Sequence, residues 1–275
     1  MRIAVTGARG LLGSAFVELA VREGHEVLGL DKQGGREVVS ERLSFDVIDV
    51  TDAGQFARAL AGCEALVHLA AHTSPSRAAA YKVHNDNVVA SYNALVLAAE
   101  AGLKRVCQAS SINAIGASFS REPRYDYFPL DEGHPTYNED PYSLSKWICE
   151  AQASSVCRAY PGLGVASLRF HMLVPDRRSA LERVKQWGPA GGGRKGLWGY
   201  TTLPGAARAC LAALTADFSG HEVFYIVAEL TASEEASQDL HRRFYPHVPL
   251  RRELVGHASF FDTAKALKLL SWRDC

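Results

Sequence analysis

Three side chains in the middle of the chain have types and spacings that suit proton transfer. Tyr142 and Lys146 lie four residues apart, so they share a face if this segment is helical. A phenol with a pKa of about 10 is a poor base at neutral pH, and a nearby ammonium group favours its ionised form. Ser111 ends an apolar run and could donate a hydrogen bond to a substrate oxygen. The pattern predicts Tyr142 as acid/base, Lys146 as the group that lowers the pKa of Tyr142 and binds a ribose, and Ser111 as the residue that orients the substrate oxygen.

A glycine-rich turn near the start of the chain predicts a cofactor for this chemistry. An apolar run is followed by Thr6–Gly13, with the sequence TGARGLLG, and a second apolar run ends at Asp31. Gly7 permits a tight turn, Gly10 lets the backbone approach a pyrophosphate, and Gly13 lets a helix pack closely on the strand. The N-terminus of that helix offers unpaired N–H groups and a positive dipole end. The stretch therefore predicts a dinucleotide-binding site.

The residue at the end of the second strand indicates which dinucleotide is bound. Asp31 can accept hydrogen bonds from both ribose hydroxyls, and its charge repels a 2′-phosphate. This favours NAD(H), while Lys32 and Arg36 leave NADP(H) as the alternative. With a nicotinamide cofactor, a hydride moves between substrate carbon and nicotinamide C4 while a proton moves through Tyr142.

Strand-like runs alternate with helix-like segments up to residue 170. Pro141 is expected to begin a helix that contains Tyr142 and Lys146. The pattern predicts an α/β fold, a doubly wound parallel sheet of the Rossmann type, whose ligands bind beyond the carboxyl ends of the strands. The segment 32–41 is expected to be a loop. The expected strands cover residues 3–5, 26–30, 43–49, 65–71, 105–111 and 165–170, and the helices after the first cover about 51–60, 81–101 and 141–160.

The alternation loosens after His171. We therefore expect a dinucleotide-binding domain at residues 1–171 and a small C-terminal substrate-binding lobe at residues 172–275, part of which returns to the main sheet. The glycine-rich segment 188–196 is expected to be a flexible loop. The remaining expected elements are helices at 179–187, 203–214, 233–243 and 262–270, and a strand at 223–227.

Composition excludes several classes of function. The 275 residues carry 30 basic and 30 acidic side chains, so no basic field recruits nucleic acid. No apolar run is long enough to span a bilayer, and none precedes the first strand, so we expect a cytoplasmic protein with no membrane partner. The six cysteines form no Cys-x-x-Cys pair and are expected to be reduced, and no spacing predicts a metal site. The cysteines are Cys63, Cys107, Cys149, Cys157, Cys210 and Cys275.

The motifs together resemble those of an extended short-chain dehydrogenase/reductase, the NAD-dependent epimerase/dehydratase family. In size the chain is similar to the uronate-dehydrogenase-like branch. It departs from the family pattern at Ala90, at residues 170–175 and at Pro204, in the half expected to bind substrate. The matching segments are Thr6–Gly13, Asp46–Val47, His68–Ala71, Asn87–Asn93, Ser110–Gly116, Pro141–Lys146 and Ala264–Leu270.

The resemblance implies roles for individual residues. It implies Ser111, Tyr142 and Lys146 as the catalytic residues, and Asp46 with Val47 as contacts on the adenine side. It also implies a homodimer through the helices at 81–101 and 141–160. The full set of expected cofactor contacts is Gly7, Gly10, Leu11, Leu12, Gly13, Asp31, Asp46, Val47, Leu69, Ala70, Ala71, Asn87, Ala109, Tyr142 and Lys146.

Four further residues are candidate substrate contacts. His72 and Thr73 follow the fourth parallel strand, where loop capping is an equally good reading. Asn113 lies two residues after Ser111, and His171 either faces the nicotinamide or is a satisfied buried histidine, which we favour. Arg177, Arg178, Arg194 and Lys195 could meet a ligand, although solvated charge is the simpler reading.

Three functions are consistent with this pattern. The first is an NAD-dependent oxidoreductase that acts on an alcohol or carbonyl of a small sugar-like or secondary-metabolite substrate. The second is an NDP-sugar epimerase or dehydratase with tightly bound NAD. The third is a non-catalytic dinucleotide-binding sensor, against which the presence of Ser111, Tyr142 and Lys146 argues.

Overall fold

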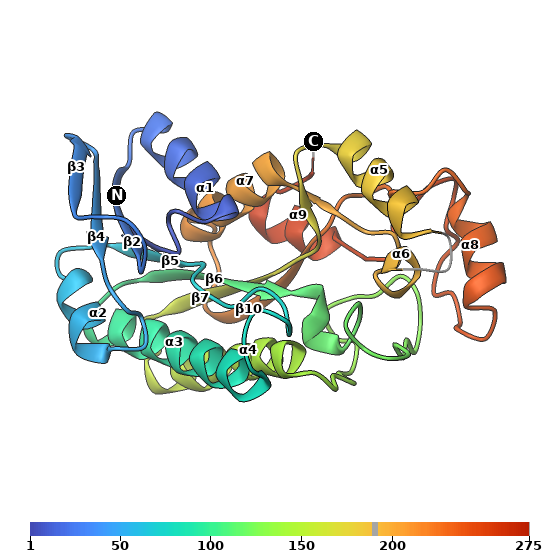
Figure 1. The fold of residues 1–275 in the computed structure, drawn as a ribbon, viewed down its shortest axis with the longest axis horizontal. Helices are drawn as coiled ribbons and strands as arrows, with labels where there is room; N and C mark the ends of the chain where they lie inside the picture. Colours follow the sequence, from blue (N-terminus) through green and yellow to red (C-terminus); the bar gives the residue numbers. More distant parts are fainter. Residues whose placement is uncertain (189–191, 275) are drawn as a thin grey trace.

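The computed structural model describes residues 1–188 and 192–274, and its centre is one eight-stranded sheet (Figure 1). The strand order is β10-β7-β6-β5-β1-β2-β4-β3, and every pair is parallel except β3 with β4. The strands are β1 (Arg2–Thr6), β2 (Glu26–Asp31), β3 (Glu37–Ser40), β4 (Leu43–Val47), β5 (Ala65–His68), β6 (Arg105–Ser111), β7 (Gly164–Phe170) and β10 (Gly220–Ile226), and β8 (Leu173–Val174) pairs with β9 (Thr201–Thr202) separately.

Helices cover both faces of the sheet, as the predicted doubly wound fold requires. Helices α1, α7 and α9 lie on one face and α2, α3 and α4 on the other (Figure 1). One apolar core fills the space under each layer. These helices are α1 (Leu11–Arg22), α2 (Ala53–Ala59), α3 (Ala80–Glu100), α4 (Pro141–Ala159), α7 (Leu203–Thr215) and α9 (Ala264–Leu270).

A third apolar core belongs to a smaller lobe beyond the carboxyl ends of the strands. It joins the segment after Ser111 to parts of the chain near residues 200 and 260, with Phe128 packed on Phe260. The lobe contains η1 (Ile112–Ile115), α5 (Arg177–Trp187), α6 (Gly192–Lys195) and α8 (Ser237–Phe244). Strand β10 comes after α5 and α6 in the chain, yet it pairs with β7 in the main sheet. The C-terminal third therefore contributes to a core of the main sheet as well as to the core of the lobe.

Most predicted elements are confirmed to within a few residues, and two segments differ. The predicted loop at 32–41 contains β3, because the Val38 region pairs antiparallel with β4. The predicted flexible loop at 188–196 contains α6, which is held by tertiary bonds: Arg194 pairs with Glu122, and Lys195 donates to the Ser120 carbonyl. Residues 189–191 of that segment lie outside the described residues.

The five cysteines in the described part of the chain are free and buried. They are Cys63, Cys107, Cys149, Cys157 and Cys210, while Cys275 lies outside the described residues. No helix in the described part is long and apolar enough to cross a membrane. The same residues contain no group of three or more histidine, cysteine or acidic side chains arranged for a metal ion.

Candidate active site

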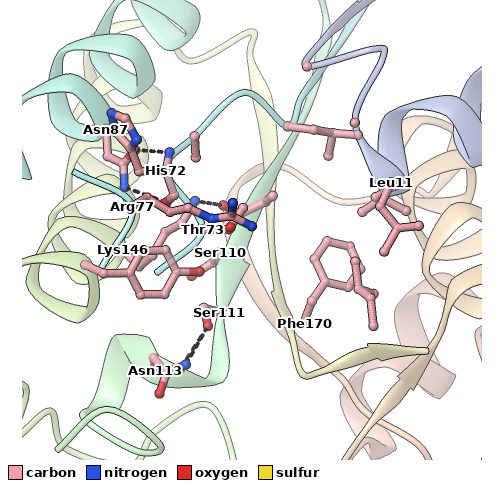
Figure 2. A pocket seen from close by; sticks show the side chains of 18 of the residues that line it. Leu11, His72, Thr73, Arg77, Asn87, Ser110, Ser111, Asn113, Lys146 and Phe170 are labelled. Atoms are coloured by element: carbon pink, nitrogen blue, oxygen red, sulfur yellow. Dashed lines mark hydrogen bonds between the residues drawn. The ribbon is translucent and has the colours of Figure 1, made fainter. Parts of the chain in front are cut away.

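A cavity of about 1080 Å³ lies at the carboxyl ends of the strands, between the sheet and the lobe. One end, which we call the glycine end, is lined by Gly7, Gly10, Gly13 and Asp31. The other, the catalytic end, is lined by Ser111, Tyr142 and Lys146. Figure 2 shows Leu11 and Phe170 on one side of this space and Lys146, Ser111 and His72 on the other. The cavity thus brings together the two patterns that the sequence separates by about a hundred residues.

The glycine end is formed by backbone. Gly7 has a left-handed φ of +66°, and a Cβ atom there would lie 2.9 Å from the Ala70 nitrogen. A Cβ at Gly13 would collide with the Gly7 carbonyl oxygen and lie 2.8 Å from the Ala8 Cα. Asp31 accepts hydrogen bonds from the backbone nitrogens of Arg9 (3.0 Å) and Gln33 (3.1 Å), which fix its carboxylate beside the turn. The contacts explain why side chains are excluded from these glycine positions.

The loop after β5 is tied to the glycine turn by Thr6, a residue that the sequence did not single out. Thr6 Oγ1 accepts from the nitrogens of Leu69 (3.1 Å) and Ala70 (3.2 Å). It also lies 2.8 Å from His68 Nδ1. Burial lowers the pKa of His68 to about 3, and the charge of Lys146 adds to the effect. Because Thr6 Oγ1 already accepts two hydrogen bonds, its hydroxyl proton is the one left to donate to His68 Nδ1. These bonds hold the loop that contains Leu69, Ala70 and Ala71 in place at the cavity wall.

Asn87, which lies on α3, also holds the loop after β5 in place. Its Oδ1 accepts from the His72 nitrogen (2.8 Å), and its Nδ2 donates to the His72 carbonyl (3.1 Å) and to Ser145 Oγ (3.0 Å). His72 Nε2 lies 2.9 Å from Asp86, and Thr73 follows in the cavity wall (Figure 2). The substrate-contact candidates His72 and Thr73 therefore lie in the cavity wall, and the polar groups of Asn87 are used to shape the loop that carries them.

The structure corrects the expected position of the adenine-side residues. Asp46 and Val47 do not line the cavity: Asp46 accepts from its neighbour's nitrogen, and Val47 is 42% exposed. Instead Ile48, Val50 and Thr51 line the wall. The reason is that β4 ends at Val47, so the chain turns into the cavity only after that residue. The repeated Asp-Val pattern at 46–47 and 49–50 was the signal that could have corrected the assignment.

The three side chains predicted to be catalytic, Ser111, Tyr142 and Lys146, line the same cavity, and burial shifts the pKa of two of them. Lys146 Nζ donates to the Ala109 carbonyl (2.7 Å) and lies 5.9 Å from the centre of the Tyr142 ring. Burial raises the pKa of Tyr142 to about 12, while a hydrogen bond from Ser111 opposes that rise. Burial also lowers the pKa of Lys146. Desolvation is the largest cause of the rise in the Tyr142 pKa, so the lowering by Lys146 stays a prediction.

The catalytic helix is anchored one turn beyond Lys146. Glu150 and Arg169 form a buried two-pronged ion pair, with Nε–Oε1 at 2.9 Å and Nη2–Oε2 at 2.8 Å. Ser110, the neighbour of Ser111, donates to the same carboxylate (2.5 Å). Asp140 accepts from the nitrogens of Tyr142 and Ser143 and so caps the start of α4. Strands β6 and β7 and helix α4 are thereby fixed relative to one another.

The remaining charged candidates have structural partners. The His171 nitrogens are both satisfied: Nδ1 accepts from the Met172 nitrogen (2.6 Å) and Nε2 lies 2.7 Å from the Gly196 carbonyl. Burial lowers the pKa of His171 to about 4, which confirms the satisfied-histidine reading for a side chain in the cavity wall. Arg177 donates to the Thr231 carbonyl, and exposed Arg178 pairs with Glu182. Neither arginine lines the cavity.

Sequence reasoning missed two arginines that do line the cavity. Arg77 follows the β5 loop and Arg183 lies on α5. Within residues 1–188 and 192–274, neither side chain has an ion-pair or hydrogen-bond partner, whereas Asp86 is paired with both Lys82 and His72. Arg77 is labelled among the cavity-lining side chains in Figure 2. No local motif marks these residues, because only the tertiary structure brings both segments to the same cavity.

A family model now decides the classification. The model described as the NAD dependent epimerase/dehydratase family matches residues 3–184, which include the glycine turn and the catalytic helix. The chain belongs to this family. Its members are NAD-dependent enzymes, in agreement with the cofactor expected from Asp31.

Named relatives of this family member include different enzymes. A putative UDP-glucose 4-epimerase of Methanocaldococcus jannaschii is 27% identical over 64% of this chain and 57% of its own length. Tetraketide alpha-pyrone reductase 1 of Arabidopsis thaliana is 28% identical over 98% of this chain and 89% of its own length. Thus the chain spans less than two thirds of the epimerase but most of the reductase.

Solved structures show the same fold. MoeE5, in complex with UDP-glucose and NAD, has a TM-score of 0.72 and 21% identity, covering 100% of this chain and 94% of its own. At 21% identity, the similarity to MoeE5 supports the fold of this chain and says nothing about the substrate of this chain.

The glycine end fits NAD. The N-cap residue Gly10 makes no side-chain cap, and Gly10 to Gly13 line the cavity, so the first N–H groups of α1 are left for a ligand. The crowded positions of Gly7 and Gly13 and the fixed carboxylate of Asp31 complete a cradle for a dinucleotide. The rest of the cavity wall along which the dinucleotide is expected to lie is formed by Leu11, Leu12, the loop after β5, Ala109, Tyr142 and Lys146.

Proposed function

We propose that the protein is an NAD-dependent oxidoreductase that transfers a hydride between nicotinamide and an alcohol or carbonyl carbon of a small sugar-like or secondary-metabolite substrate. One observation carries the proposal: Ser111, Tyr142 and Lys146 lie in the same cavity as the glycine turn. The reductase relative that aligns with nearly the whole chain favours net oxidation or reduction.

The chain's own residues act on the proton and the substrate oxygen. NAD supplies the hydride donor or acceptor when it is bound. In the reducing direction, Ser111 donates a hydrogen bond to the carbonyl oxygen, which holds it beside Tyr142. With a pKa of about 12, Tyr142 is protonated at neutral pH, and its hydroxyl proton passes to the substrate oxygen as the alcohol forms. Lys146, fixed by the Ala109 carbonyl, presents its other donors to the cavity and binds the ribose.

We further propose that the substrate carries an anionic group. Arg77 and Arg183 leave positive charge unpaired in the cavity wall, while the carboxylate of Asp86 is already neutralised. Both arginines are exposed in the structure, and a ligand that covers them keeps their charge favourable only when it supplies the opposite charge. Arg183→Ala should raise KM for a carboxylated or phosphorylated substrate at least several-fold and leave a neutral analogue unaffected.

The second candidate is an NDP-sugar epimerase or dehydratase that retains NAD through its cycle. The observation that favours it is the epimerase relative, which aligns with 64% of this chain. The purified protein distinguishes the candidates. Incubation with NAD and a panel of free aldoses, uronic acids, NDP-sugars and aryl or alkyl alcohols should give net NADH formation, followed by absorbance at 340 nm.

The outcomes separate three functions. Net NADH formation supports the oxidoreductase, and product without net NADH, with NAD released only on denaturation, supports the epimerase or dehydratase. NAD binding without turnover on any compound, unchanged in Tyr142→Phe, would instead support a non-catalytic sensor.

We also propose a cytoplasmic homodimer. The buried free cysteines are typical of a reducing compartment. Helices α3 and α4 pack side by side, and their outward residues include the exposed Tyr81, Tyr92 and Trp147. Light scattering should give a mass of two chains, and Tyr92→Glu should reduce it to one; a single-chain mass for the unmodified protein would refute the dimer.

A further inference from the structure

Both N–H donors of Asn113 point at one oxygen, the hydroxyl of Ser111. The backbone nitrogen lies 3.1 Å and the side-chain Nδ2 lies 3.3 Å from Ser111 Oγ, and Figure 2 shows the two residues side by side in the cavity. The first of these bonds is also the N-cap of η1. Asn113 is 7% exposed, so both bonds are shielded from water.

This geometry fixes the direction of the Ser111 proton. A serine hydroxyl has one proton to donate and two lone pairs that accept. Asn113 occupies both lone pairs, so the proton cannot point back toward Asn113. The polar group that remains beside it is the Tyr142 phenol, whose pKa Ser111 lowers against the effect of burial. Ser111 is therefore held as a donor that faces the reacting oxygens.

We propose that Asn113 is a positioning residue that keeps the single Ser111 proton directed away from Asn113, so that Ser111 donates it to the substrate oxygen when substrate is bound. The inference rests on the proposed oxidoreductase function and replaces the expectation that Asn113 contacts substrate through its own side chain.

The same amide orientation leaves one atom of Asn113 unpaired. Asn113 Oδ1 is buried and has no hydrogen-bond partner in the described part of the chain. Leaving a buried carbonyl oxygen unpaired is unfavourable. Turning the amide over would let Oδ1 accept the Ser111 proton, but Ser111 would then no longer donate to substrate. The observed orientation leaves Oδ1 unpaired and keeps the Ser111 donor available.

Asn113→Asp tests the proposal because it changes the hydrogen-bonding polarity with little change in shape. An ionised aspartate only accepts, so it draws the Ser111 proton away from the substrate. We expect kcat to fall about 100-fold at pH 8, the size typical for one lost donor to a reacting oxygen. The Kd for NAD, measured by calorimetry, should stay within about 2-fold, because Asn113 lies at the catalytic end. The substrate is the compound that the wild-type protein turns over fastest in the panel above.

The pH profile separates positioning from a structural effect. A protonated aspartic acid regains one O–H donor. Burial at this site, where Asn113 is 7% exposed, should raise the pKa of the aspartic acid above its ordinary value of about 3.9. The kcat of Asn113→Asp relative to wild type should therefore rise as the pH falls from 8 to 5. A ratio that stays constant across this range would overturn the proposal, since a merely distorted site gives a pH-independent loss.

Asn138→Asp is a matched control. Asn138 Nδ2 donates to Thr136 Oγ1 (2.6 Å), the same bond from an amide to a hydroxyl two residues earlier, but Asn138 does not line the cavity. Its kcat should stay within about 2-fold of wild type at every pH. If Asn113→Asp does not fold, Asn113→Ala takes its place. That variant keeps the backbone bond and should lose kcat several-fold, and full activity would count against Asn113.

Ser111→Ala distinguishes failure of this inference from failure of the proposed function. If Ser111→Ala and wild type turn over equally, the assigned chemistry is wrong, and the role of Asn113 falls with it. If Ser111→Ala is impaired while Asn113→Asp matches wild type at every pH, only the positioning role is wrong.

Discussion

The glycine end of the cavity is shaped by backbone atoms, and the catalytic end is shaped by side chains. At the glycine end the shape comes from backbone that leaves no room for side chains, as the crowded Cβ positions at Gly7 and Gly13 show. At the catalytic end it comes from buried polar and ionisable side chains, among them Tyr142 and Lys146. A backbone cradle recognises what every dinucleotide shares, whereas buried side chains tune a reaction. The comparison predicts that changes at one end affect binding and changes at the other affect turnover.

Tyr142→Phe should give the largest effect and sharpen this contrast. Removing the hydroxyl that transfers the proton should lower kcat by about 100- to 10,000-fold. The Kd for NAD should change no more than about 3-fold, because the glycine end is untouched. Steady-state kinetics and calorimetry measure the two quantities.

Tyr160→Phe is the control for that experiment. It removes a hydroxyl at the end of the same helix, away from the cavity. Its kcat should be unchanged, and a Tyr142→Phe variant with more than a tenth of wild-type kcat would contradict the catalytic role.

Glu150→Ala should be the most destabilising change at the catalytic end. It leaves the guanidinium of Arg169 buried without its carboxylate, a loss of about 3–5 kcal/mol in the free energy of unfolding. Urea unfolding followed by circular dichroism measures the change. Because Ser110 also loses its acceptor, kcat should fall in the part of the population that remains folded.

Two comparisons test whether the unpaired charge of Arg169 causes the loss of stability in Glu150→Ala. Glu182→Ala breaks the exposed pair with Arg178 and should cost no more than about 0.5 kcal/mol. The double change Glu150→Leu with Arg169→Met removes both charges and should be less destabilising than Glu150→Ala. If the double variant is the less stable of the two, the stranded charge is not the cause.

Gly13→Ala tests the glycine end. The added methyl group meets backbone atoms of Gly7 and Ala8, which cannot move aside as a side chain would. We expect a loss of about 1–3 kcal/mol in stability and an increase in the Kd for NAD of at least about 10-fold.

The matching change at an open position is Gly35→Ala, where a Cβ meets nothing within 4 Å. It should alter neither stability nor NAD affinity measurably. Equal NAD affinity in Gly13→Ala and Gly35→Ala would show that the turn does not hold the cofactor.

Acidification should lower the free energy of unfolding by a smaller amount. Burial lowers the pKa of His68, near the glycine end, to about 3 and that of His171, in the lobe, to about 4. Unfolded histidine titrates near about pH 6.5. Between these values the unfolded chain binds more protons than the folded one, so stability falls as the pH drops from 6.5 toward 4. Chemical denaturation at pH 7.0, about 5.5 and about 4.5 should show this decline.

His68→Gln and His171→Gln should each flatten the decline by removing one such histidine. Slopes identical to wild type in both variants would assign the acid sensitivity to other groups.

Local patterns sufficed for the sheet and for much of the site. The apolar run that ends at Ser111 predicted β6, and Pro141 predicted the start of α4. These features depend on neighbours in the chain, so the sequence carries them directly. The pairing of β3 escaped prediction because an edge strand depends on its partner, here β4.

Long-range contacts decided what local patterns could not. Val50 lines the cavity and Val47 does not, and this difference depends on where β4 ends. The pKa of Tyr142 depends on how many atoms bury it, and spacing to Lys146 says nothing about that burial.

By itself, the sequence determined the parallel sheet, the glycine turn, the helix that places Tyr142 one turn before Lys146, and the family. These follow from the period of apolar residues and from the short-range geometry of glycine and proline. Only the tertiary structure decided that Arg77 and Arg183 line the same cavity, that Glu150 pairs with Arg169, and that Asn113 points both donors at Ser111. Such contacts join segments whose meeting depends on the packing of the whole chain, or fix side-chain directions that residue order does not specify.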